Sequence, residues 1–326
     1  MRNNWIRTPA RIGFVLCGFI AATIGLAQPK ITPARDIIGF NIGDDYKLMN
    51  YTQLSTLLKK WSTESDRMKL VSIGNTEEGR PQYMAIISSP ANLAKLDHWK
   101  DISQKLSRAR IPEETARQFA KEGKAVIWID GGLHATETVN AQEFPEMIYQ
   151  MTSRTDEETM RFLDDIVLLM PLCNPDGMEL VSNWYMRNPD PLQREMANLP
   201  RLYHKYVGHD NNRDALMFNL SETTNMGRQL FIEWNPQIMY NTHQPGPDSG
   251  YIVFVPPFRD PFNYDLDPLI PIGIEAVGTA MHQRLIAKNM PGTGMRDASS
   301  YSTWYNGAMR TSPYYRNQIG ILTEIQ

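Results

Sequence analysis

Two patterns of apolar residues alternate along the chain. Short, nearly continuous apolar runs are typical of strands buried on both faces of a sheet, and they cover residues 70–73, 83–87, 125–129, 166–172, 238–240, 251–255 and 319–322. Longer segments carry apolar residues at helical spacing, at residues 46–65, 93–109, 113–121, 139–151, 157–163, 222–234 and 269–287. Pro145 lies inside one of them and predicts a kink or a later helix start. The alternation predicts an α/β fold, with three α/β/α layers around a twisted, mixed and largely parallel sheet.

The first residues have the features of a signal peptide. Arginines at positions 2, 7 and 11 precede an apolar run over residues 12–26, and Gly25-Leu26-Ala27 supplies small residues for cleavage after Ala27. The alternative is an uncleaved anchor, but the run is shorter than the ~20 residues that a membrane span needs. We therefore expect residues 1–27 to be removed and the protein to be secreted or periplasmic, with no stable membrane insertion afterwards.

Composition narrows the classes of function further. Of the two cysteines, Cys17 lies in the signal peptide and Cys173 in an apolar run, so a disulfide framework is excluded and Cys173 is expected to be a buried thiol. The formal net charge of −3 offers no basic stripe for nucleic acid. The remaining residues, 28–326, are enough for one large domain.

Residues suited to metal chemistry follow several of the predicted strands. His134 and Glu137 come shortly after the strand 125–129, His243 follows the strand 238–240, and Glu324 lies at the end of the last one. In open α/β sheets, ligands bind beyond the carboxyl ends of the strands. Two histidines and one glutamate are the ligands of a catalytic zinc with an open position for water, and a further carboxylate can act as the base.

Longer motifs around these residues extend the pattern. They are Gly131-Gly132-Leu133-His134-Ala135-Thr136-Glu137, Asn174-Pro175-Asp176-Gly177, Trp184-Tyr185-Met186-Arg187, Asp210-Asn211-Asn212-Arg213, Thr242-His243-Gln244 and Leu322-Thr323-Glu324. With these motifs in this order, the chain resembles the zinc metallocarboxypeptidase family of the carboxypeptidase A type. The segment Thr303-Trp304-Tyr305-Asn306-Gly307, followed by Tyr314-Tyr315, is similar to a secreted bacterial branch of that family.

The resemblance implies a role for each matching residue at the reaction centre. His134, Glu137 and His243 would bind one Zn²⁺ per chain. Glu324 would be the general base that takes a proton from zinc-activated water and passes it to the leaving amine. Arg187 would polarise the scissile carbonyl and hold the developing oxyanion.

The resemblance also implies how the substrate is held. Asn212 and Arg213 would bind the free C-terminal carboxylate, for which a guanidinium presents a matching pair of donors. Tyr305 would lie near the terminal peptide bond, with Tyr301, Tyr314 and Tyr315 as alternatives.

These expectations lead to a prediction of function. Residues 28–326 would be a zinc peptidase catalytic domain, incomplete at its C-terminal end because the family continues beyond the strand that carries the base. The protein would be a zinc-dependent metallocarboxypeptidase that hydrolyses the C-terminal bond of peptides with a free terminal carboxylate. Two alternatives stay open, a zinc amidase acting on cell-wall peptides and a non-catalytic binding module of the same fold.

Overall fold

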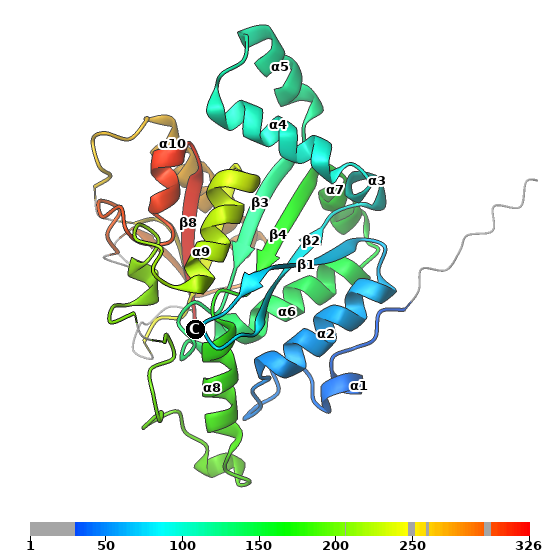
Figure 1. Cartoon of the computed structure of the whole chain (residues 1–326), viewed down its shortest axis with the longest axis vertical. Coiled ribbons are helices and arrows are strands. Elements are labelled where there is room, and N and C mark those ends of the chain that lie inside the picture. Colours follow the sequence, from blue (N-terminus) through cyan, green and yellow to red (C-terminus); the bar gives the residue numbers. More distant parts are fainter. Residues whose placement is uncertain (1–29, 206, 247–251, 259–260, 297–300) are drawn as a thin grey trace, which may run out of the picture.

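The computed structural model describes residues 30–205, 207–246, 252–258, 261–296 and 301–326 (Figure 1). The described residues form one eight-stranded sheet in the order β1-β2-β4-β3-β5-β8-β6-β7. Its strands are β1 Met68–Asn75, β2 Pro81–Ile87, β3 Ala125–Asp130, β4 Ile166–Pro171, β5 Ile238–His243, β6 Val253–Phe258, β7 Thr293–Arg296 and β8 Ile319–Ile325. The predicted signal peptide lies outside the described residues.

The middle of the sheet is parallel and its edges are mixed. Strands β4, β3, β5 and β8 run parallel to one another, whereas β1 is antiparallel to β2 and β2 is antiparallel to β4. On the other side, β6 is antiparallel to β8 and parallel to β7. The predicted mixed, largely parallel sheet is confirmed. Because β3, β5 and β8 are parallel, their carboxyl ends meet at one edge, where His243 is paired in register with Glu324.

Helices surround this sheet on both faces (Figure 1). They are α1 Arg35–Ile38, α2 Tyr51–Glu64, α3 Pro90–Leu93, α4 Leu96–Arg108, α5 Glu113–Glu122, α6 Thr138–Ser153, α7 Glu157–Asp165, α8 Pro175–Met186, α9 Ser221–Arg228 and α10 Leu269–Ala287. Short helical turns are η1 Pro191–Gln193, η2 Asn211–Arg213, η3 Gln229–Glu233 and η4 Ser312–Arg316. The helix around Pro145 begins at Thr138 and continues through the proline, which therefore does not mark its start.

Two apolar cores hold the layers together. Along β2, Ala85 and Ile87 belong to a core that includes residues of α2 and α6, while Met84 and Ile86 belong to a second core with residues of α4 and α9. Since successive side chains of a strand point to opposite faces, the two cores lie on opposite sides of the sheet. This arrangement confirms the three-layer fold.

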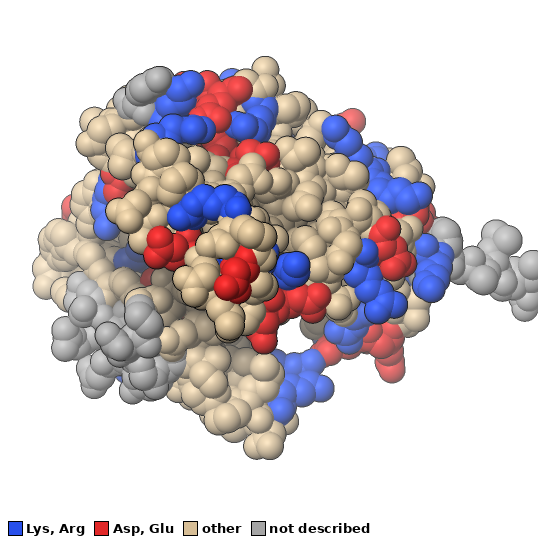
Figure 2. All heavy atoms as spheres, turned by 90° about the horizontal axis from the view of Figure 1, so that it is seen from below, with Lys and Arg blue, Asp and Glu red and all other residues tan. Residues whose placement is uncertain are grey.

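Three further observations concern Cys173, membrane-spanning helices and surface charge. Cys173 is buried and unpaired, as expected. Within the described ranges, no helix has both the length and the apolar character needed to cross a bilayer. On the face shown in Figure 2, basic and acidic side chains are interspersed and form no continuous basic stripe.

Candidate functional site

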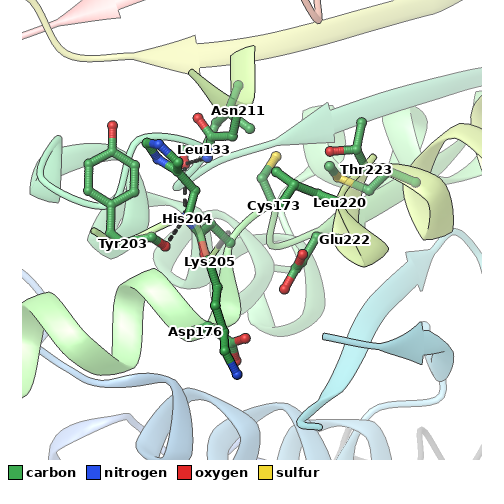
Figure 3. A pocket seen from close by; sticks show the side chains of 12 residues that line it. Leu133, Cys173, Asp176, Tyr203, His204, Lys205, Asn211, Leu220, Glu222 and Thr223 are labelled. Carbon is green, nitrogen blue, oxygen red and sulfur yellow. Dashed lines mark hydrogen bonds between the residues drawn. The ribbon is translucent and has the colours of Figure 1, made fainter. Parts of the chain in front are cut away.

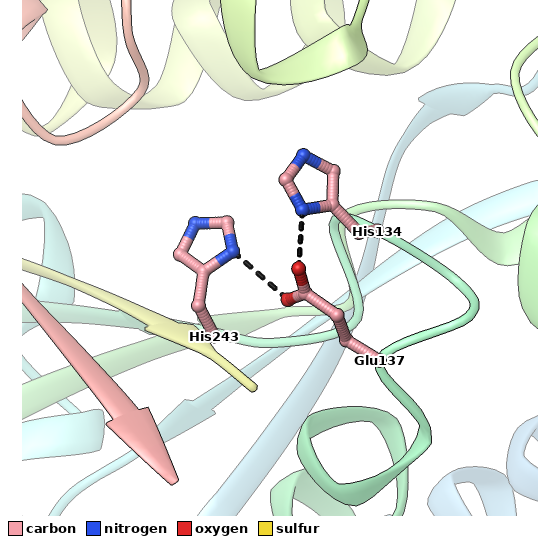
Figure 4. Close-up of side chains that lie close together, drawn as sticks. All are labelled: His134, Glu137 and His243. Carbon is pink, nitrogen blue, oxygen red and sulfur yellow. Dashed lines mark hydrogen bonds and ion pairs between the residues drawn. The ribbon is translucent and has the colours of Figure 1, made fainter. Parts of the chain in front are cut away.

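Three potential metal ligands meet at the carboxyl edge of the sheet (Figure 4). The Glu137 carboxylate lies between two imidazoles, with Oε1 at 2.6 Å from Nδ1 of His134 and Oε2 at 3.0 Å from Nδ1 of His243. One donor atom from each residue lies within 4.8 Å of the others. The structure thus brings together the three residues that the sequence motifs suggested as metal ligands.

A tight turn after β3 places the first two ligands. Gly132 has a φ of +69°, in the left-handed region that favours glycine, and a Cβ on Gly131 would lie 2.9 Å from the backbone oxygen of Asn140. The loop therefore packs directly against α6. The N–H of Glu137 then donates to the carbonyl of His134 at 3.0 Å, and α6 begins at the next residue. This geometry turns both side chains toward the end of β5.

The donor set fits a zinc ion. Two imidazole nitrogens and a carboxylate are typical of catalytic zinc sites, in which ligand bonds of about 2.0–2.1 Å at tetrahedral angles put neighbouring donors roughly 3.3 Å apart. The two nitrogen–oxygen separations of 2.6 and 3.0 Å are a few tenths of an ångström shorter. Burial alone would raise the pKa of Glu137, but hydrogen bonds from His134 and His243 outweigh it and lower this pKa to about 2. The carboxylate is therefore ionised at neutral pH, as a metal ligand must be.

A buried chain of hydrogen bonds orients His243. Its Nε2 lies 2.5 Å from Oδ1 of Asn241, whose Nδ2 donates to Oδ1 of Asp130 at 2.5 Å. The Trp128 indole donates to the other oxygen of Asp130 at 2.6 Å. Because Asp130 accepts from the Asn241 amide, Oδ1 of Asn241 is left to accept from Nε2–H of His243. In this contact Nδ1 faces Glu137; with Nε2–H donated to Asn241, Nδ1 would present its lone pair to a bound ion in place of Glu137, which is the tautomer a metal ligand needs.

Asp210 contacts the outer ring nitrogen of His134, as Asn241 contacts that of His243. Its Oδ1 lies 3.0 Å from Nε2 of His134 and also accepts the Asn212 N–H at 2.7 Å at the start of η2. Sequence reasoning did not single out Asp210 or Asp130 as site residues. The signal that could have found Asp130 is an acidic residue at the end of an otherwise apolar strand.

Glu324 lies beside the ligands and is almost entirely buried. It is paired in register with His243, and 6% of it is exposed. Burial raises the pKa of Glu324 to about 7, although a hydrogen bond from Tyr301 acts in the opposite direction. A cation held by the three ligands would lower this pKa. A carboxylate whose pKa lies near neutrality is suited to take up and release a proton.

These residues line one cleft of about 300 Å³. Of the residues predicted for the site, those lining it are His134, Glu137, Asn212, Arg213, His243, Tyr305 and Glu324. Tyr301 also lines the cleft, whereas Tyr314 is buried in the core beside α10. A second cavity, shown in Figure 3, has a volume of about 10 Å³ and is too small for more than about one water molecule.

Arg187 is the predicted residue that the structure does not bring to the cleft. Its guanidinium lies 3.8 Å from the ring centre of Trp184, and it pairs with Glu195 at 3.8 Å. The reason is α8, a 12-residue helix that the sequence analysis did not predict. The helix starts near the site, where Asn174 contacts the carbonyl of Leu133, and its length of about 18 Å carries Arg187 away.

Arg310 is a cleft residue that sequence reasoning missed. It lines the cleft together with Arg213 and Glu324, and 6% of it is exposed. No motif marks it in the sequence. Its place depends on the path of the chain between β7 and β8, which only the fold shows.

Comparisons with known proteins agree with this geometry. A family model described as zinc carboxypeptidase matches residues 54–306. Among solved structures, the metallo-carboxypeptidase from Burkholderia cenocepacia has a TM-score of 0.57 at 14% identity, over 86% of this chain and 61% of that chain. The metallo-carboxypeptidase from Pseudomonas aeruginosa, solved with (2-guanidinoethylmercapto)succinic acid, has a TM-score of 0.56 at 14% identity, over 86% and 61%.

A third solved structure covers more of this chain. Thrombin activatable fibrinolysis inhibitor has a TM-score of 0.55 at 16% identity, over 90% of this chain and 72% of that one. A search of curated proteins finds no match. At these identities the structural likeness establishes the fold, and the chain spans less than two thirds of the length of both bacterial enzymes.

Proposed function

Because the chain belongs to the zinc carboxypeptidase family, we propose that it is a zinc-dependent carboxypeptidase that removes the C-terminal residue of peptides. The observation that carries this proposal is the convergence, in one cleft, of a two-histidine, one-glutamate ligand set, a buried carboxylate and a guanidinium. The first could hold zinc, the second could move a proton, and the third could bind a terminal carboxylate.

The ligand set and Glu324 would divide the chemistry between them. His134, Glu137 and His243 would hold the ion, which when bound acts as a Lewis acid and makes a coordinated water more acidic. Glu324 accepts the proton of the attacking water and donates it to the leaving amine. Its buried position keeps bulk water from competing for that proton, and burial, which raises its pKa, opposes the lowering by the bound cation.

Arg213 and Asn212 would position the substrate. Arg213 is exposed at the cleft and uses Nη1 to donate to the carbonyl of Asn212 at 2.9 Å, which leaves its other donors available to a substrate carboxylate. The ring of Tyr305 lies 5.6 Å from this guanidinium. Asn212 is held by the N–H of Met309, which donates to Oδ1 at 2.8 Å. We do not assign the oxyanion to Arg187, since it lies outside the cleft.

The location of the protein is part of the proposal. The arginines and apolar run of residues 1–27 support export, and a secreted or periplasmic peptidase would meet peptides with free carboxyl ends. Mass spectrometry of the mature N-terminus tests this point. A chain that retains residues 1–27 in the cell membrane would contradict it.

A matched pair of peptides tests the activity. N-acylated peptides that vary in their last residue are prepared as free acids and as C-terminal amides, and zinc content is measured on the same protein. We expect the free acids to be hydrolysed at least ~100-fold faster, because an amide leaves the Arg213 guanidinium without its charged partner. Arg213→Met should abolish this difference and Arg187→Met should preserve it. Equal turnover of acids and amides would refute the proposal.

A further inference from the structure

The cleft contains a buried guanidinium whose bonding capacity is largely unused. Arg310 is 6% exposed, and its Nη2 donates to the carbonyl of Ser302 at 2.5 Å. Its Nε has no hydrogen-bond partner. Across the described segments of the chain, no carboxylate forms an ion pair with it, and the Tyr301 ring centre lies 5.9 Å away. Arginine stays protonated in proteins, so this charge is present at any working pH.

The surroundings of Arg310 make this charge unfavourable in the empty cleft. Burial lowers the pKa of Arg310, the Arg213 guanidinium adds to this effect, and Glu324 opposes it. A buried charge that lacks a close counter-ion destabilises a protein. Glu324 does not lie within ion-pair distance of Arg310. As the proposed general base, it would also lose its negative charge each time it accepts a proton. Among the described residues no carboxylate is close enough to pair with Arg310, so a carboxylate of a bound ligand could supply the missing partner.

The backbone around Arg310 holds the guanidinium in the cleft. A Cβ on Gly320 of β8 would lie 1.9 Å from the carbonyl oxygen of Arg310, so the segment packs directly on the strand. On its other side, the Met309 N–H donates to Asn212 at 2.8 Å and the Ser312 hydroxyl donates to the carbonyl of Ala215 at 3.1 Å. With these contacts on both sides, Arg310 cannot turn out to solvent without breaking the floor of the site.

Two guanidiniums at different depths thus line one substrate cleft. Arg213 is exposed and Arg310 is buried, and both belong to the cleft that contains the metal ligands. One terminal carboxylate satisfies one of them. An apolar last residue would leave Arg310 buried and unpaired, and a basic one would be repelled by it.

We propose that the enzyme selects peptides ending in aspartate or glutamate, with Arg310 binding the side-chain carboxylate while Arg213 holds the terminal one. This inference rests on the proposed carboxypeptidase function and adds the class of residue that is removed. Arg310 acts as a specificity-determining residue through a charged, hydrogen-bonded contact that forms only with an acidic substrate.

Four peptides that differ only in their last residue test the selection. They end in Glu, Gln, Leu or Lys as free acids, and kcat/KM is measured with the zinc-loaded protein. Glu and Gln have nearly the same shape, so their ratio isolates the charge. We expect the Glu peptide to exceed the Gln peptide by at least ~100-fold, the effect of leaving a buried charge unpaired.

Two variants show whether Arg310 is responsible. Arg310→Met should reduce the Glu:Gln ratio to within a few-fold of one, mainly by loss of activity on the Glu peptide. Arg316→Met is the matched control, because Arg316 follows on the same segment but bonds Ser312 and packs on Phe231 outside the cleft. It should keep the ratio of the unmodified protein. Zinc content and thermal unfolding confirm that both variants are folded.

The outcomes separate this inference from the proposed function. Hydrolysis of the Leu or Gln peptide at the rate of the Glu peptide overturns the inferred selectivity but agrees with the proposed carboxypeptidase function. A uniform loss on every peptide in Arg310→Met also overturns it, since Arg310 would then act on the reaction centre. If no peptide is hydrolysed, the proposed function fails. Calorimetric binding of the Glu and Gln peptides to zinc-loaded Glu324→Gln then decides the selection, and equal affinities overturn it.

Discussion

Replacement of Glu324 by Gln should stabilise the metal-free protein and abolish its activity at the same time. Glu324 is 6% exposed, and burial raises its pKa from 4.5 to about 7. A raised pKa means that folding disfavours the ionised form, so the carboxylate destabilises the folded state wherever it is ionised. Gln has nearly the same shape and carries no charge, so the variant lacks this penalty.

The size of the effect follows from the pKa shift. One pKa unit corresponds to ~1.4 kcal/mol, so a shift from 4.5 to about 7 destabilises the ionised protein by about 3 kcal/mol. The penalty is absent below pH 4.5, grows between pH 4.5 and about 7, and is complete above that range. Relative to Glu324→Gln, the unmodified protein should therefore lose stability as the pH rises through this window.

Urea unfolding in the presence of a chelator measures this difference. The free energy of unfolding is compared between the two proteins at the acidic and basic ends of the window, so that all other titrating groups cancel. Zinc content and peptide hydrolysis are then measured after zinc loading. We expect unchanged zinc content and a ~10²–10⁴-fold fall in kcat, which is typical for loss of a general base.

Several results would refute this reasoning. A stability difference that does not change with pH would show that the Glu324 carboxylate is not destabilised by its environment. Loss of zinc in Glu324→Gln would make the residue a ligand, and retained turnover would place the base elsewhere. A more stable protein with no activity would instead show that the fold tolerates a destabilising carboxylate because the chemistry requires it.

Three further predictions address the metal and the scaffold. Elemental analysis should find about one zinc per folded chain and a loss of that zinc in His243→Ala, because the site then has two protein ligands. Asn241→Leu should weaken zinc binding ~10–100-fold in chelator competition, since His243 loses the acceptor that sets its tautomer; unchanged affinity would contradict this role. Burial raises the pKa of Glu222 to about 7, so Glu222→Gln should increase the free energy of unfolding at pH 8 by roughly 2–3 kcal/mol and have little effect near pH 4. Equal gains at both pH values would refute the last prediction.

Much of the candidate metal site could be predicted from the sequence because its signals are local. The apolar runs showed where strands end, and His134, Glu137, His243 and Glu324 each follow such an end. Parallel strands bring their carboxyl ends to one edge, so residues that are far apart in the chain were expected to meet there. The structure brings these four side chains to the same cleft, where β3, β5 and β8 end.

Other features were decided only by the tertiary structure. Arg187 follows an Asn-Pro-Asp-Gly sequence that is compatible with a simple turn, but Asn174 caps α8 there and the helix carries Arg187 away from the cleft. Asp130 supports His243 through Asn241 because β3 and β5 are adjacent and paired in register, which no local pattern encodes. Arg310 reaches the cleft through an irregular segment that packs on Gly320. Periodicity records which face of an element is buried, whereas the meeting of a loop residue with a distant strand depends on how the whole chain packs.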